Sequence, residues 1–144
     1  MKTFQLQKVA LVKEAACEYH VNDPSSAKEV CAKIGLENEC DECVMLFCLN
    51  VKGDVIASFE VSRGTPSMAY VHPREVFKKA ILANSEAIIV AHNHPSGNVE
   101  PSLDDFDTMN RLSDAGKIMG IPVADFVITA PHGGFYSAKL DEKL

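Results

Sequence analysis

Residues 87–97 read AIIVAHNHPSG, an apolar run that becomes polar at His92. The first five residues are apolar at every position, which is typical of a central strand covered on both faces. His92 and His94 follow at alternate positions. Because the side chains of an extended chain alternate between faces, both imidazoles are expected to project to the same side at the end of the strand. An open α/β sheet commonly places its functional site at such a strand end.

Helical and strand-like segments alternate on both sides of this stretch, which predicts an α/β domain. Each expected helix is followed by a residue suited to ending it, namely Gly35, Asn84 or Gly120. The expected helices span residues 27–34, 73–82 and 103–119. The expected strands span residues 43–51 and 55–61, which a tight turn joins, then 87–91, 121–129 and 135–137, with an edge strand at 9–12 and a short apolar run at 69–71.

The composition suits one compact domain. The chain has 144 residues, of which 47% are hydrophobic and 24% charged, so it can bury a core and does not resemble a disordered segment. Its formal net charge of −6 disfavours independent nucleic-acid binding, because acidic side chains repel phosphate. No run approaches the roughly 20 apolar residues that cross a bilayer. Residues 1–14 do not resemble a signal peptide, so we expect a cytoplasmic protein.

The five cysteines lie at irregular spacing and do not resemble a disulfide framework. Cys40 and Cys43 have the C-x-x-C spacing of zinc and redox sites. A structural zinc site would normally require a second pair of ligands at similar spacing, and the sequence contains none. A redox motif would be expected at the start of a helix, whereas an apolar strand follows here. We therefore interpret this pair as a chance occurrence.

A third candidate metal ligand follows the two histidines. Residues 102–105 read SLDD at the expected start of a helix, and Asp105 falls in its first turn. There its carboxylate would be close enough to the strand end to join His92 and His94. Two imidazole nitrogens and one carboxylate oxygen leave the fourth position of a tetrahedral zinc ion open, which is the layout of a catalytic site. Zinc in such a site activates water and polarises a carbonyl group.

A zinc hydrolase also requires a general base and a group that stabilises the tetrahedral oxyanion. Ser102, three residues before Asp105, is well placed for the second role. The base must be a carboxylate that is not itself a metal ligand. From the residues alone, Glu42, Glu60 and Glu75 are all candidates.

These residues resemble a known signature. The string HNHPSG at residues 92–97, followed by Ser102 and Asp105, is similar to the H-x-H-x7-S-x2-D motif of the JAMM (JAB/MPN) metalloproteases. The wider context resembles the RadC branch of that superfamily, through VHPREVF at 71–77 and through Thr108, Arg111 and Leu112. We therefore expect residues 27–144 to form a RadC-like JAB/MPN domain, and residues 1–26 to be an N-terminal extension packed on it.

The resemblance implies a mixed β-sheet flanked by helices, similar to the fold of cytidine deaminases. It implies that His92, His94 and Asp105 hold Zn2+. It also implies that Ser102 contacts the zinc-bound water or stabilises the oxyanion, and that Glu42 is the catalytic glutamate that hydrogen-bonds this water. The implied reaction is hydrolysis of a peptide or isopeptide bond. The implied substrate is a peptide or protein, with a ubiquitin-like conjugate as one candidate.

The same residues also allow other interpretations. Ser102 and Asp105 also match a capping-box pattern at a helix start, which is compatible with metal ligation. A nucleobase deaminase would use an H-x-E element and a later P-C-x-x-C pair, whereas here Pro95 follows the second histidine. The alternative function is a RadC-type accessory role in DNA repair or mobile-element metabolism without catalysis. The sequence gives no signal for an oligomeric state.

Overall fold

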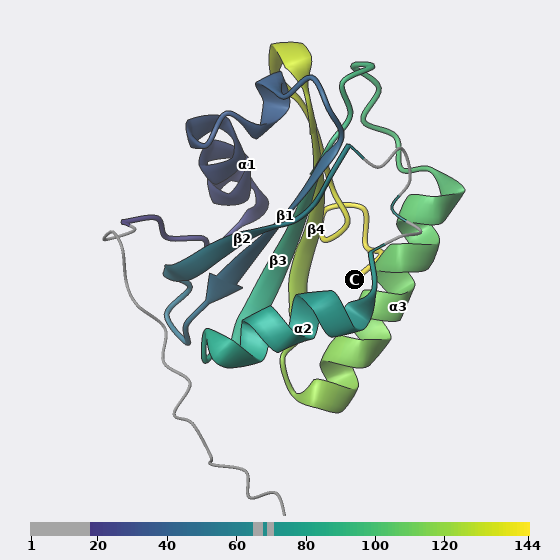
Figure 1. Ribbon diagram of the computed structural model, residues 1–144. Coiled ribbons are helices and arrows are strands. Elements are labelled where there is room, and N and C mark those ends of the chain that lie inside the picture. The colour runs from purple at the N-terminus through teal and green to yellow at the C-terminus, as the bar shows by residue number, and fades with distance from the viewer. Residues whose placement is uncertain (1–17, 65–67, 69–70) are drawn as a thin grey trace, which may run out of the picture.

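A computed structural model describes residues 18–64, 68 and 71–144 of the chain (Figure 1). The expected strand at 9–12 therefore lies outside the described residues, as does most of the run at 69–71. The described helices are α1 (Pro24–Lys33), α2 (Pro73–Leu82) and α3 (Leu103–Met119). The strands are β1 (Cys43–Leu49), β2 (Val55–Arg63), β3 (Ala87–Asn93), β4 (Val123–Ala130) and β5 (Gly134–Ser137), and two 3-10 turns are η1 (Leu36–Asn38) and η3 (Pro131–Gly133).

The five strands form one mixed sheet in the order β2-β1-β3-β4-β5. The central strand β3 is antiparallel to β1 and parallel to β4. Helix α1 packs on one face of this sheet, and α2 and α3 pack on the other (Figure 1). The expected α/β fold, a mixed sheet flanked by helices, is confirmed.

The continuous apolar run of β3 follows from this layering. Ile88 and Val90 belong to the core that α2 and α3 cover, whereas Ile89 and Ala91 belong to the core under α1. Since both faces of the strand are buried along residues 88–91, apolar side chains are favoured on both. The strand is two residues longer than the expected 87–91, because His92 and Asn93 continue its pairing with β4 and are themselves buried.

The helix ends agree with the expected stop signals. Gly35, Asn84 and Gly120 adopt left-handed backbone conformations with φ of 74°, 57° and 68°. These residues end α1, α2 and α3 and turn the chain toward the next element, as glycine and asparagine do at many helix ends. Among the described helices, none is long and apolar enough to cross a membrane.

A buried aspartate ties the C-terminal segment to β4. Asp125 is 3% exposed, and its carboxylate accepts hydrogen bonds from Ser137 Oγ at 2.7 Å and from the Phe126 and Lys139 N–H groups at 2.8 and 3.1 Å. Burial raises the pKa of Asp125, although these three hydrogen bonds favour its ionised form. The carboxylate therefore joins β4 to β5 and to the residues that follow β5, an arrangement called here the β4–β5 junction.

Replacing Asp125 by alanine is expected to lower the free energy of unfolding by about 2–3 kcal/mol, because two buried donors and one part-buried donor lose their acceptor. Asp125→Asn should cost less, since a neutral amide keeps an acceptor oxygen and avoids burying a charge. Urea unfolding of both variants measures the difference. Equal losses for alanine and asparagine would contradict this account of the junction.

Candidate metal centre

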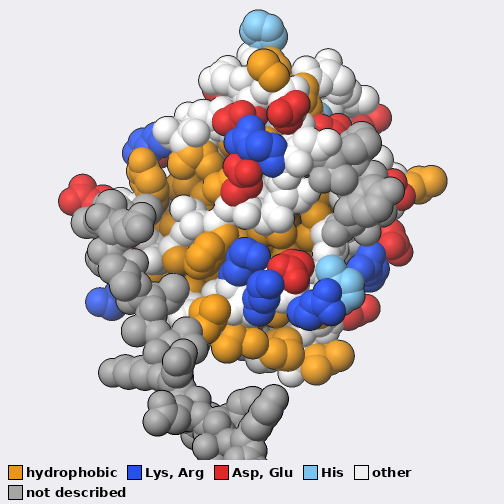
Figure 2. Space-filling model, viewed as in Figure 1, with side chains coloured by type: hydrophobic (Ala, Val, Ile, Leu, Met, Phe, Trp, Pro, Cys, Tyr) orange, Lys and Arg blue, Asp and Glu red, His pale blue; other side chains and the backbone are white. Residues whose placement is uncertain are grey.

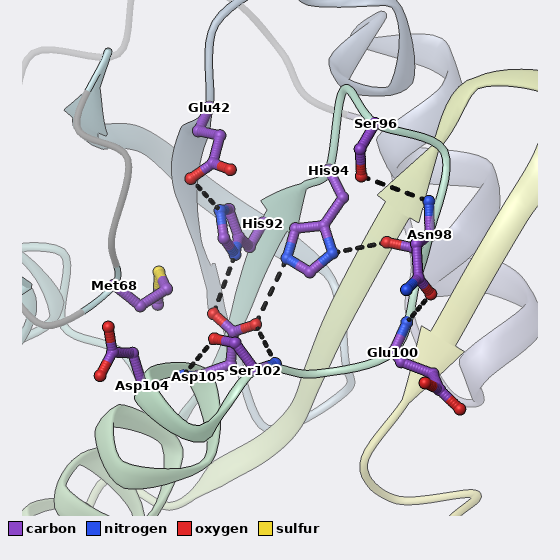
Figure 3. A pocket seen from close by; sticks show the side chains of 10 residues that line it. All are labelled: Glu42, Met68, His92, His94, Ser96, Asn98, Glu100, Ser102, Asp104 and Asp105. Carbon is purple, nitrogen blue, oxygen red and sulfur yellow. Dashed lines mark hydrogen bonds and ion pairs between the residues drawn. The ribbon is translucent and has the colours of Figure 1, made fainter.

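Two histidines converge at the end of β3 (Figure 3). His92 is the sixth residue of the strand, and its side chain lies on the face covered by α2 and α3, like Ile88 and Val90. His94 follows the last strand residue, but its N–H still donates to Thr129 O of β4 at 2.8 Å, so the extended conformation continues. The imidazole centroids are 4.7 Å apart, with the ring planes at 90°.

Asp105 approaches both rings from the first turn of α3. Ser102 is the N-cap of this helix: its Oγ accepts the Asp105 N–H at 3.1 Å, and its own N–H donates to Asp105 Oδ2 at 2.8 Å. This reciprocal capping box fixes the carboxylate. Asp105 Oδ1 lies 3.4 Å from His92 Nδ1, and Oδ2 lies 3.3 Å from His94 Nε2. Capping and contact with the histidines therefore coexist in one side chain.

The three side chains fit a metal ion. Each offers one ligand atom, and the three atoms lie within 4.8 Å of one another. His92 Nδ1 contacts Asp105 without hydrogen-bond geometry, and it is one of two buried side-chain atoms in the described part of the chain with no hydrogen-bond partner. A buried orphan nitrogen is costly unless another ligand satisfies it. Two nitrogens and one carboxylate oxygen are donors that zinc accepts.

The tautomer of His94 also suits a ligand. Its Nδ1 lies 2.7 Å from the carbonyl oxygen of Asn98, which can only accept a hydrogen bond. In the neutral ring Nδ1 therefore carries the hydrogen, and Nε2, which faces Asp105, keeps its lone pair. Orientation of a metal-binding histidine through its second nitrogen is common.

The charges around this cluster favour a cation. Burial opposes ionisation of Asp105, but the two imidazoles and the Ser102 N–H outweigh it and lower the pKa of this carboxyl far below its ordinary value. The attraction of Asp105 raises the pKa of His94, against the effect of burial. A nearly buried carboxylate that stays ionised supplies negative charge in a region of low dielectric, where a bound cation gains most.

A pocket opens on one side of the cluster (Figure 3). Glu42, in the loop just before β1, points into it, and its Oε2 lies 3.6 Å from His92 Nε2. Among the described residues that line the pocket, none is a lysine or arginine. The lining residues are Glu42, Met68, His92, His94, Ser96, Asn98, Glu100, Ser102, Asp104 and Asp105.

The other two candidate bases lie elsewhere. Glu60, on β2, accepts hydrogen bonds from Arg63 at 2.8 and 3.0 Å. Glu75, on α2, pairs with Lys78 Nζ at 2.7 Å, within a group of basic side chains over that helix (Figure 2). Neither residue lines the pocket. Cys40 and Cys43 are not part of the His92, His94 and Asp105 cluster found among the described residues.

Two asparagines were missed by the sequence analysis. Asn98 supplies the carbonyl that fixes His94, and Asn93 holds the loop that carries Glu42. Strand alternation gave a signal for Asn93, because a residue between two side chains that share a face must point to the opposite one. The role of Asn98 depends on a loop turn, which has no comparable signal.

Comparisons with known proteins agree with this geometry. The sequence profile of the RadC-like JAB domain family matches residues 21–143. The UPF0758 protein of Rubrobacter xylanophilus is 47% identical over 98 residues, which cover 68% of this chain and 42% of the relative. The UPF0758 protein of Finegoldia magna is 39% identical over 123 residues, which cover 84% of this chain and 54% of the relative. The chain thus spans about half the length of these relatives, or less.

Proposed function

The chain belongs to the RadC-like JAB domain family, and we propose that it is a zinc-dependent hydrolase of peptide or isopeptide bonds. One observation carries this proposal: His92, His94 and Asp105 converge on one point, on the side of a pocket into which Glu42 projects. Three protein ligands with one open side are typical of catalytic rather than structural zinc.

The proposed ligands are Asp105, a ring nitrogen of His92, and Nε2 of His94. A zinc ion held by them would lower the pKa of a bound water and act as a Lewis acid on a carbonyl group. Asp105 would supply the negative charge that retains the ion, and the capping box with Ser102 would keep its carboxylate in place. The hydrogen bond from His94 Nδ1 to Asn98 would hold that ring in its binding tautomer.

Glu42 is the proposed general base. Its carboxylate would accept a proton from the attacking water at Oε2 and then pass it to the leaving amine, as general acid–base catalysis requires. The side chain of Glu42 is 32% exposed, while that of the adjacent His92 is 3% exposed. Glu42 can therefore reach both a substrate in the pocket and a water beside the metal ligands.

Ser102 is the proposed oxyanion donor. Its Oγ uses a lone pair to accept the Asp105 N–H, so the hydroxyl hydrogen is not consumed by the helix cap. Ser102 lines the pocket, where this hydrogen can donate to the negative oxygen that develops on the attacked carbonyl. One residue would thus orient a ligand and stabilise the transition state.

We propose a peptide or protein substrate, with a ubiquitin-like conjugate as one candidate, and a cytoplasmic location. The net charge of −6 and the acidic side chains of Glu42, Glu100 and Asp104 in the pocket lining disfavour nucleic acid as the bound molecule, because they repel phosphate. A non-catalytic accessory role in DNA repair or mobile-element metabolism is the alternative that the following test must exclude.

The proposal predicts that the purified protein binds about one zinc per chain. It also predicts that the zinc-loaded protein cleaves at least one of two matched substrates, a peptide and an isopeptide through a lysine ε-amine. Chelation should abolish cleavage and added zinc should restore it. Zinc-loaded protein that cleaves neither substrate, but binds duplex DNA with a steep salt dependence, would favour the accessory role.

A further inference from the structure

We infer that Asn93, the residue between the two histidines, is a positioning residue that holds Glu42 beside the metal ligands. This inference rests on the proposed role of Glu42 as the base. His92 and His94 point toward α3, and Asn93 points to the opposite face of the sheet, toward the loop before β1. Residues 92–94 would therefore supply two of the proposed metal ligands and also fix the position of the proposed base, Glu42.

The side chain of Asn93 is fully buried, and its amide accepts one hydrogen bond from this loop and donates two to it. Its Oδ1 accepts the Cys43 N–H at 2.6 Å. Its Nδ2 donates to the carbonyl oxygens of Glu39 at 3.2 Å and Asp41 at 3.0 Å. These contacts lie on both sides of Glu42 in the sequence, so Asn93 clamps the backbone from which the Glu42 side chain extends.

The outer side of the loop has two further contacts. The Gly64 N–H donates to Glu42 O at 2.8 Å, and Arg63 pairs with the Glu39 carboxylate at 2.7 Å. The ion pair is about 40% exposed on both partners, and such pairs contribute little to stability. The hydrogen bond from the Cys43 N–H to Asn93 is buried, so its loss leaves that N–H unpaired, and the two part-buried bonds to the Glu39 and Asp41 carbonyl oxygens are lost with it. Removing the Asn93 side chain should therefore loosen the loop more than breaking the exposed ion pair.

Asparagine suits this role better than aspartate, serine or alanine. The site requires one acceptor for an N–H and two donors for carbonyl oxygens, which is the inventory of a side-chain amide. An aspartate would keep the acceptor but would place a second acceptor against two carbonyl oxygens. Serine and alanine would not span the distance. A substitution of Asn93 should therefore disturb the loop that carries Glu42 while every proposed metal ligand stays unaltered.

The experiment uses zinc and acetohydroxamate as probes, so it does not depend on knowing the substrate. Acetohydroxamate chelates zinc through two oxygens and gives its acidic proton to a nearby carboxylate. Glu42→Gln should weaken its binding to the zinc-loaded protein by about ten-fold, the effect of one charge-assisted hydrogen bond. Asn93→Ala should weaken binding by a similar factor, and the double variant should bind no more weakly than either single variant.

Zinc affinity and hydrogen exchange complete the test. Asn93→Ala should retain zinc affinity within about three-fold, because the Asn93 side chain bonds to the Glu42 loop and to none of the proposed ligands that an outer-shell change would disturb. The Cys43 amide should exchange faster. Ser137→Ala, an equally buried hydrogen-bonding site at the β4–β5 junction, is the matched control and should leave hydroxamate binding unchanged. Asn93→Asp, which preserves volume, replaces the alanine variant if that variant does not fold, with the same expected direction.

The outcomes separate the two claims. Additive losses in the double variant, or an unchanged hydroxamate affinity in a folded Asn93 variant, would overturn the role of Asn93 while leaving the proposed function intact. Wild-type protein that binds no zinc, or that binds zinc but no hydroxamate, would overturn the proposed function and this inference with it. Losses of hydroxamate affinity that are not additive in the double variant, with zinc affinity retained, would support both the proposed function and the role of Asn93.

Discussion

Asp105→Asn is expected to lower the zinc affinity of the protein on the order of 10³-fold, because the variant loses the anionic ligand of a site whose other proposed ligands are neutral. The helix start should survive the change. The amide oxygen of asparagine can still accept the Ser102 N–H, and the backbone N–H still donates to Ser102 Oγ. The loss of zinc would therefore report on ligation and not on unfolding. Competition with a chromophoric chelator gives the affinity.

The matched control removes the same charge from the same helix. Asp107 is on α3, its side chain is 72% exposed, and its contact with Arg111 is long, at 3.9 Å. Asp107→Asn should bind zinc as the wild type does, and its circular dichroism should match that of Asp105→Asn. If both variants bound zinc with wild-type affinity, the carboxylate of Asp105 would be no more than a part of the helix cap.

Glu42→Gln should reduce the hydrolysis rate by about 10²–10⁴-fold, the usual contribution of a general base. The variant should keep about one zinc per chain, because Glu42 is outside the ligand set. Glutamine preserves the shape of the side chain and its ability to hydrogen-bond, but it cannot accept a proton at neutral pH. The rate is measured on whichever matched peptide or isopeptide substrate the wild type cleaves, with zinc quantified in the same sample.

Glu75→Gln is the control for this result. Glu75 precedes Lys78 and Lys79 on α2, pairs with both, and does not line the pocket, so its replacement should leave the rate unchanged. A Glu42→Gln variant that retained full activity, combined with a Glu75→Gln variant that lost it, would assign the base to α2.

The sequence pattern was sufficient for the elements with strong local signals. The unbroken apolar run at 87–91 predicted a central strand because both faces of β3 are covered, and Gly35, Asn84 and Gly120 predicted helix ends because each adopts the left-handed conformation that few other residues accept. The end of β3 was placed two residues early. Polarity indicates exposure in most strands, but His92 and Asn93 are buried because α3 and the loop before β1 cover them.

The convergence of the three proposed ligands was also predictable, since strand alternation aligns His92 with His94 and the capping box places Asp105 nearby. Which of Glu42, Glu60 and Glu75 lies beside His92 was not predictable from the residues alone. It depends on contacts between segments far apart in the chain, such as Asn93 with Cys43, which are separated by 50 residues. Such pairings follow from strand order, which one sequence read by local pattern does not reveal.

The most direct test of the central claim is anomalous scattering from crystals of the zinc-loaded protein, measured on both sides of the zinc absorption edge. The account predicts one peak at about 2.0–2.2 Å from a ring nitrogen of His92, from Nε2 of His94 and from an oxygen of Asp105, with Glu42 facing the open side. A stoichiometric zinc peak located elsewhere, with Asp105 bonded to Ser102 and to no metal, would contradict it.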